Sequence, residues 1–299
     1  MRRWPMLCTL LAAVLAAGCD GIRPSTFTAG WSDPVASASV SASAAPEPES
    51  EPGSETPPTA TEEEQAPYQG LQVFDDWRTH HTSSSPCPAE MVFIKDFCID
   101  RWEGSLVEVT PEGVKPFPPT HRPEQRRIRA VSRPNVMPQS YIAGHEAQRA
   151  CEMAGKRSCT DGEWFRACEG PKGTIFPYGT VLDKEACRGD RKLHPMHELY
   201  GENAGQEIWM VEPMNNPAIN EQFDTVALTG SLPKCVGPWG IFDMVGNLQE
   251  WTNDPAGTFR GGAYSTNNAL GCQYSTTVHG FGYHDYSLGF RCCSEPFNP

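Results

Sequence analysis

The chain of 299 residues lacks several features that define common protein classes. Positive charge is scarce: 24 Lys and Arg stand against 37 Asp and Glu, so the formal net charge is −13. This balance argues against a nucleic-acid partner, because phosphate binding needs a basic surface. Beyond residue 20 no run of about 18 apolar residues occurs, so no membrane-spanning helix is expected there. The chain also has no Cys-x-x-Cys pair, which argues against a zinc ribbon.

The first residues are typical of a bacterial export signal. Arg2 and Arg3 precede a short apolar stretch at 6–17, and small residues then lead to Cys19. This pattern resembles the lipoprotein signal, in which the cysteine sulfur receives a diacylglycerol. We expect residues 1–19 to form such a signal and Cys19 to carry the lipid, which places the protein at the bacterial cell envelope, facing the periplasm or the outer surface. An ordinary cleaved signal is the alternative.

Residues 20–67 have the composition of a disordered tether. They contain one Arg and nine acidic residues, and no aromatic residue occurs from Asp33 to Pro67. Such a segment, rich in Ala, Ser, Pro, Glu and Thr, cannot bury enough apolar surface to offset the entropy lost on ordering. We expect a spacer between the membrane and one folded domain, formed by residues 68–299.

Deletion of residues 33–67 should therefore leave the melting temperature of the folded domain nearly unchanged, because the tether buries nothing. Calorimetry of the deleted and full chains checks this expectation. A shift of many degrees would show that the segment packs against the domain.

The domain itself is expected to have little regular secondary structure, because Gly and Pro recur throughout it. Two helices are predicted, one at 145–154 from a stripe of small residues and one at 161–169 behind a Thr-x-x-Glu capping box. Two short strands are predicted at 91–94 and 97–99, with a turn between them. Beyond residue 170 we expect short strands and long loops.

Four motifs in this domain together resemble the formylglycine-generating enzymes, also called sulfatase-modifying factors. In chain order they are AGKRSCTDGEW at 154–164, GIFDMVGNLQEW at 240–251, RGGAY at 260–264 and GFR at 289–291. Similar segments follow one another in the same order in that family. The resemblance implies a single irregular α+β domain with a C-type-lectin-like core.

The second motif contains a candidate calcium site. Asn247 and Glu250 supply hard oxygen atoms three residues apart, which suits Ca²⁺. The resemblance also implies a structural Ca²⁺ in this loop, and a turn with a surface Glu is the alternative. Arg260 and Arg291, in the last two motifs, are expected to pin loops together through buried hydrogen bonds rather than to bind an acidic ligand.

The position of the family's copper site is altered in this chain. Formylglycine generation in the family uses two cysteines soon after the third motif to hold Cu(I), and soft thiolates suit that ion. Here Thr266 stands at the first of these places and Gly271 at the second, with Cys272 one step beyond. Cys272 is therefore the remaining candidate for a catalytic thiol, and the sequence argues against standard copper-dependent oxidation.

Ten cysteines lie beyond Cys19, and an even number in an exported chain favours up to five disulfides. The family resemblance implies a bridge between Cys151 and Cys292. It also places Cys168 with Cys272 as its nearest candidate partner, in which case Cys272 is structural. Cys293 competes for either bridge. Sequence order alone suggests Cys87 with Cys98 and Cys187 with Cys235.

A second candidate metal site lies near the C-terminal end. His279, His284 and Asp285 form a polar group among tyrosines, and two His with one carboxylate are the ligands of many non-haem iron sites. Two glycines separate the histidines, so the direction of each side chain stays open. A binding groove or a hydrogen-bonded surface loop is the alternative.

Two function classes follow from these features. The first is a lipid-anchored binding domain that recognises a protein, a peptide or a glycan in the cell envelope. The second is an oxidase of the formylglycine-generating type that modifies an exported protein or peptide. The altered copper position favours the binding domain, because a fold does not by itself establish chemistry.

Overall fold

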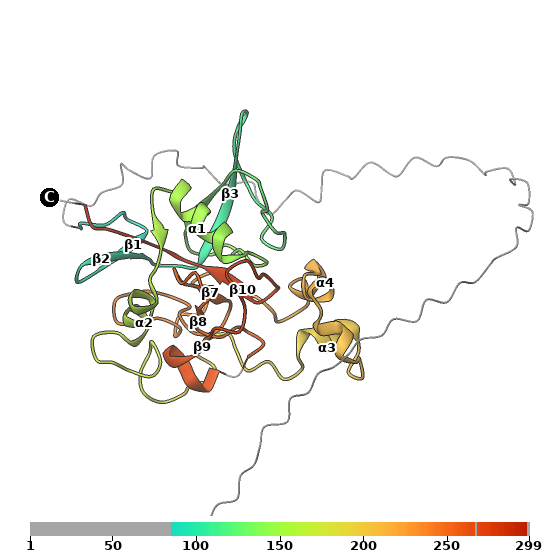
Figure 1. Ribbon diagram of the computed structural model, residues 1–299. Helices are drawn as coiled ribbons and strands as arrows, with labels where there is room; N and C mark the ends of the chain where they lie inside the picture. Colours follow the sequence, from blue (N-terminus) through green and yellow to red (C-terminus); the bar gives the residue numbers. More distant parts are fainter. Residues whose placement is uncertain (1–84, 267, 298–299) are drawn as a thin grey trace, which may run out of the picture. The chain divides into compact units, whose positions relative to one another are not determined.

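The structure, a computed structural model, describes residues 85–266 and 268–297 (Figure 1). The predicted signal, the lipid site at Cys19 and the tether lie outside these residues. Within the described part of the chain, no helix has both the length and the apolar character needed to cross a membrane. The strands of this part form three small sheets, and short helices and long loops connect them.

The first sheet joins the beginning and the end of the described chain. Its strands, in the order β1-β2-β11-β6, are β1 (Met91–Ile94), β2 (Phe97–Asp100), β11 (Cys292–Ser294) and β6 (Arg157–Ser158). β1 and β2 form an antiparallel hairpin around Lys95, which has a φ of 56°. The hairpin predicted from the sequence is confirmed.

The second sheet brings three of the sequence motifs together. Its order is β10-β7-β8-β9, with β7 (Gln249–Trp251), β8 (Phe259–Arg260), β9 (Ser275–Thr276) and β10 (Leu288–Phe290). β7 pairs in parallel with β10 and antiparallel with β8. The QEW, RGG and GFR segments, separate in the sequence, therefore lie side by side at the centre of the domain (Figure 1).

The third sheet supports the first helix. Its order is β4-β3-β5, with β3 (Gly104–Thr110), β4 (Gly113–Pro116) and β5 (Ile128–Ser132). α1 (Gly144–Met153) packs against β5. The small residues Ala147, Ala150 and Cys151 form the buried face of α1, as their spacing predicted.

The second helix begins and ends where local signals predicted. α2 (Asp161–Glu169) follows Thr160, whose side chain accepts a hydrogen bond from the backbone N–H of Glu163 at 3.2 Å. The Glu163 carboxylate accepts in turn from the Thr160 N–H at 2.8 Å, which completes the capping box. Gly170, with a φ of 66°, ends the helix. Both predicted helices are confirmed.

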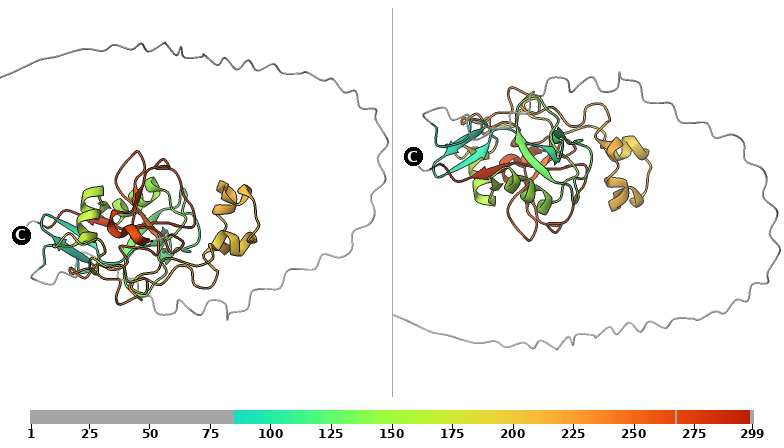
Figure 2. Two further views of the ribbon diagram at one scale, coloured as in Figure 1. Left: turned by 90° about the horizontal axis from the view of Figure 1, so that it is seen from below. Right: turned by 90° about the horizontal axis from the view of Figure 1, so that it is seen from above.

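Several helical segments beyond α2 were not predicted. They are α3 (Pro195–Tyr200), η2 (Gln206–Trp209), α4 (Val211–Met214), η3 (Pro217–Ile219) and η4 (Asn268–Gln273). Each is too short to show a helical period, and among them α3 and η3 begin at a side-chain cap, His194 and Asn216 respectively. At α3 the ring of His194 accepts from the Met196 N–H before Pro195 at the first helical position. The three views in Figures 1 and 2 agree that α3 and α4 lie together, to one side of the sheets.

Five disulfides hold this fold together. They are Cys87–Cys98, Cys151–Cys292, Cys159–Cys293, Cys168–Cys272 and Cys187–Cys235. Neighbouring residues of a strand point to opposite faces, so Cys292 reaches α1 whereas Cys293 reaches Cys159 beside β6. This alternation settles the competition between Cys292 and Cys293 that the sequence left open. The fold class expected from the sequence, an irregular and disulfide-rich α+β domain, is confirmed.

Candidate functional site

Cys272, the candidate catalytic thiol, is oxidised in the structure. Its sulfur is bonded to Cys168 on α2, and both residues are fully buried. The backbone N–H of Cys272 donates to the carbonyl of Ile175 at 2.8 Å, which fixes η4 against the neighbouring loop. A disulfide sulfur is neither a nucleophile nor a thiolate ligand for Cu(I). The catalytic role considered for Cys272 is therefore corrected to a structural one.

Thr266, at the place of the family's other copper cysteine, closes a turn. Its hydroxyl accepts from the Ala263 N–H at 2.8 Å and donates to the Ala263 carbonyl at 3.0 Å. Every cysteine of residues 85–266 and 268–297 belongs to a disulfide. The residues present therefore do not fit a Cu(I) dithiolate site.

Glu250 and Arg291 form a buried ion pair at the centre of the second sheet. Arg291 donates through Nε and Nη2 to the two Glu250 oxygens, each at 2.6 Å, and neither side chain is more than 1% exposed. The indole N–H of Trp164 donates to the same carboxylate at 2.7 Å. Arg291 also donates to the carbonyls of Asp100 and Phe242, so it pins three distant segments as the sequence indicated.

Arg260 has a similar role at the edge of the same sheet. Its guanidinium forms a two-point ion pair with Asp161, the first residue of α2, and lies over the Phe165 ring. Arg260 thus ties β8 to the N-terminus of α2 rather than facing an open site.

Asn247, the other expected calcium ligand, belongs to a separate network. Its Oδ1 accepts from the Ala227 N–H at 2.8 Å, and its Nδ2 donates to the Glu103 carboxylate at 2.6 Å. A cation held by both Asn247 and Glu250 would have to displace the Ala227 amide and the Arg291 guanidinium. The two side chains, as placed, do not fit a shared calcium site.

The motif predicts calcium binding at Asn247 and Glu250, whereas the structure pairs Glu250 with Arg291, and chelation decides between the two. Because Arg291 already neutralises Glu250, we expect a calcium chelator to leave the melting temperature of the full chain unchanged. Thermal unfolding with and without chelator, in wild type and in Glu250→Ala, provides the measurement. A chelator effect present in wild type and lost in the variant would place Ca²⁺ at Glu250 after all.

The carboxyl groups around Asn247 have raised pKa values. Burial raises the pKa of Asp243 to about 6. Burial also raises the pKa of Glu103 well above its usual range, and the nearby carboxylates of Asp243 and Glu250 add to the effect. Both groups accept hydrogen bonds from backbone amides, those of Gly230 and Leu248 respectively. The two carboxyl groups therefore serve as hydrogen-bond acceptors that hold the backbone around Asn247 in place.

The structure does not bring His279, His284 and Asp285 together. The His279 ring stacks on Tyr283 at 3.7 Å between centroids, whereas His284 pairs with the side chain of Asn215 at 2.5 Å. The Asp285 carboxylate accepts from Tyr283 and from Ser287 instead. The described residues contain no group of three or more His, Cys, Asp or Glu side chains arranged to hold a metal ion. The expected iron site is therefore wrong as a ligand set.

A cluster around His194 was missed from the sequence. Its Nδ1 accepts from the Met196 N–H, so Nε2 carries the proton and donates to the Tyr286 hydroxyl at 3.1 Å. Tyr264 lies beside Tyr286 and donates to Asn220 at 2.6 Å. The one sequence signal for this cluster is a His directly before Pro195, the arrangement of a helix N-cap followed by proline.

Acid should weaken the fold through His194. Burial lowers its pKa from 6.5 to about 4, so between these values the unfolded chain binds more protons than the folded chain. Stability contributed by neutral His194 is therefore present above pH 6.5 and is lost as the pH falls towards 4. His194→Asn keeps a capping acceptor but cannot titrate, so it should lose less stability between pH 7 and pH 4.5. Urea unfolding at pH 7 and pH 4.5 measures this difference in stability, and His145→Asn, at an exposed histidine, is the control. An equal loss of unfolding free energy between the two pH values in His194→Asn and in wild type would contradict the prediction.

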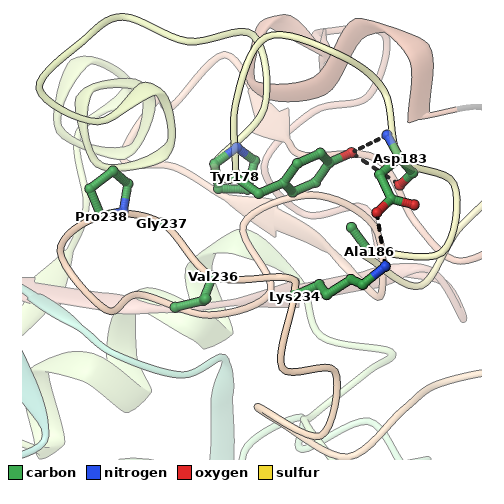
Figure 3. Close-up of a pocket in the computed structure, with 8 residues that line it drawn as sticks. Tyr178, Asp183, Ala186, Lys234, Val236, Gly237 and Pro238 are labelled. Carbon is green, nitrogen blue, oxygen red and sulfur yellow. Dashed lines mark hydrogen bonds and ion pairs between the residues drawn. The ribbon is translucent and has the colours of Figure 1, made fainter.

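A pocket of about 500 Å³ opens beside the Cys187–Cys235 bridge (Figure 3). Its lining residues are Pro177, Tyr178, Asp183, Ala186, Lys234, Val236, Gly237 and Pro238. Tyr178 reaches across to Asp183, whose carboxylate pairs with the Lys234 ammonium at 3.1 Å. With an apolar floor and one surface ion pair, this pocket can hold a side chain or small ligand but offers no activated nucleophile.

The arrangement of the sheets, the disulfides and the central ion pair defines a class of protein, a disulfide-linked α+β domain organised around its RGG and GFR segments. Residues 69–296 match the sulfatase-modifying factor enzyme 1-like domain, and the chain belongs to that family.

Two curated relatives illustrate the likeness. The chain is 27% identical over 183 residues to the formylglycine-generating enzyme of Bos taurus. This alignment covers 53% of this chain and 44% of the relative. It is 25% identical over 178 residues to the inactive Cα-formylglycine-generating enzyme 2 of Bos taurus, covering 54% and 52% respectively. The chain thus spans about half the length of the curated relatives it matches.

Two solved structures resemble the fold more distantly. PvdO from Pseudomonas aeruginosa superimposes with a TM-score of 0.41 at 13% identity, over 67% of this chain and 80% of that one. CarF superimposes with a TM-score of 0.38 at 14% identity, over 68% and 87%.

Proposed function

We propose that this chain is a binding domain of the family that has no formylglycine-generating activity. The observation that carries the proposal is the Cys168–Cys272 bond, because it consumes the one thiol that remained near the family's copper position. Thr266 supports the proposal, since its hydroxyl is committed to a turn. The relative named an inactive Cα-formylglycine-generating enzyme 2 is a precedent for such a loss within the family.

The partner, on this proposal, is a protein, a peptide or a glycan of the bacterial cell envelope, and Cys19 carries a lipid that keeps the domain there. The support for this location is the sequence before Cys19, with its paired arginines and short apolar stretch. Five disulfides in the described residues also favour an exported protein, because such bonds persist outside the reducing cytosol.

An oxidation assay on the full chain, purified with its disulfides intact, tests the loss of activity. The chain is supplied with Cu(I), oxygen and a peptide that contains cysteine. We expect no oxygen uptake above a control that contains Cu(I) and the peptide without the protein, and no conversion of cysteine to formylglycine by mass spectrometry. We also expect iodoacetamide to leave Cys272 unmodified before reduction. Oxygen-dependent conversion of the peptide would overturn the proposal and establish the oxidase alternative.

A further inference from the structure

The segment of residues 195–219, named the helical lobe below, has an apolar outer strip. Met210 and Val211, at the junction of η2 and α4, are 63% and 61% exposed. Tyr200, at the end of α3, is 36% exposed, and its hydroxyl donates to the Pro213 carbonyl at 3.1 Å. This contact sets the end of α3 against α4, the helix that begins at Val211.

This outer strip is not explained by loose packing of the lobe. The inner side chains Met196, Ile208 and Ile219 are at most 3% exposed, and they pack in one cluster with Tyr264 and Tyr286 of the main domain. The lobe is therefore anchored through a complete apolar inner face. Met210 and Val211 remain exposed although the inner side chains of the same segment are buried.

The charge around the strip is negative. Residues 193–233 contain six acidic residues and no Lys or Arg. Two of the six, Glu198 and Asp224, pair with arginines outside this stretch. Glu202, Glu207 and Glu212 are exposed, and none of these three forms an ion pair with another described residue. Glu207 precedes and Glu212 follows Met210 and Val211 in the sequence, so exposed carboxylates without an ion pair to another described residue and exposed apolar side chains belong to the same short segment.

We propose that the helical lobe is a docking surface for a basic amphipathic segment of a partner protein, in which Lys or Arg side chains border Leu, Ile or Val. The apolar residues of such a segment would cover Met210 and Val211, and its cations would meet Glu207 and Glu212. The same carboxylates repel an anionic lipid surface, so the occupant is a protein rather than a membrane. The inference rests on the proposed binding function, to which it adds a surface and the chemistry of the partner.

Peptide binding to the full chain, held in nanodiscs of zwitterionic lipid, tests the inference. The probe is a fluorescent helical peptide of Lys and Leu, and a Glu and Leu peptide of equal length is its counterpart. Empty nanodiscs give the background. The lobe variants are Glu207→Gln/Glu212→Gln and Met210→Ser/Val211→Ser. The matched control, Glu112→Gln/Glu185→Gln, removes the same charge at exposed positions outside the lobe.

We expect the Lys and Leu peptide to bind the wild-type chain saturably. Each lobe variant should raise the Kd of the peptide roughly tenfold. The control variant should change the Kd by less than about twofold, because salt screens the attraction between the peptide and carboxylates that lie outside the lobe. Equal weakening in the control, no binding of this peptide, or equal binding of the acidic peptide or of anionic vesicles would overturn the docking surface. None of these results bears on the oxidation assay, so failure of the surface and failure of the proposed function stay distinguishable.

Discussion

Replacing both cysteines of the Cys151–Cys292 bridge by serine is expected to lower the free energy of unfolding by about 3 kcal/mol. This bridge joins α1 to β11 across 141 residues, but the neighbouring Cys159–Cys293 bridge stays intact and already closes nearly the same loop. The additional loop that Cys151–Cys292 closes is therefore only about ten residues long, and its length sets the entropy that the bridge removes from the unfolded chain. In a domain of this size the loss corresponds to a fall in melting temperature of about 6–12 °C. Urea and thermal unfolding of the oxidised protein measure both quantities.

The Cys87–Cys98 bridge provides a matched control. It spans only 11 residues, and all four cysteines of the two bridges are fully buried, so serine introduces a similar polar cost at each site. The same chain-entropy relation gives about 3 kcal/mol for removing this bridge. Because the two bridges close additional loops of similar length, the two losses should agree within about 1 kcal/mol, and a loss at Cys151–Cys292 larger by about 2 kcal/mol or more would contradict the explanation from loop length.

Glu250→Gln is expected to destabilise the domain by about 3–5 kcal/mol, because it removes the carboxylate that pairs directly with the buried Arg291 guanidinium. The amide can still accept from Trp164, so the change isolates the charge from the hydrogen bond. Urea unfolding at neutral pH measures the effect. The exposed pair of Arg166 and Asp96 is the control, and Asp96→Asn should cost less than about 1 kcal/mol.

A double variant separates the pair from its two members. Glu250→Gln/Arg291→Met removes both buried charges, so it should lose clearly less stability than the two single variants together. Additive losses would show that the attraction between Glu250 and Arg291 contributes little. In that case the carbonyl contacts of Arg291 to Asp100 and Phe242 would account for its effect on stability.

The local elements were predictable because their signals lie within a few residues of one another. The Thr160 and Glu163 side chains satisfy each other's backbone amides, and Gly170 supplies the backbone conformation that ends α2. The turn at Lys95 is similarly local. By contrast, the short helices of the lobe pack through Met196, Ile208 and Ile219 against tyrosines distant in the sequence. They are too short to show the 3.6-residue hydrophobic period from which a helix is predicted.

The candidate sites were less predictable because ligand identity depends on which partner each side chain meets. The motif placed Asn247 and Glu250 three residues apart, yet Glu250 meets Arg291, 41 residues away, and Asn247 meets Glu103, 144 residues away. His279 and His284 are also close in sequence, but their rings face Tyr283 and Asn215. Spacing along the chain specifies which atoms are available, and only the packed strands decide which charges they neutralise.

The sequence by itself determined the family, through the order of its motifs, and the elements whose caps and turns are local. The tertiary structure alone decided that Cys293 bonds to Cys159 while its neighbour Cys292 bonds to Cys151, because the pleat of β11 points them to opposite faces. It also decided that Cys272 forms a disulfide with Cys168. Both outcomes depend on contacts across more than a hundred residues, which chain folding brings together and sequence spacing cannot encode.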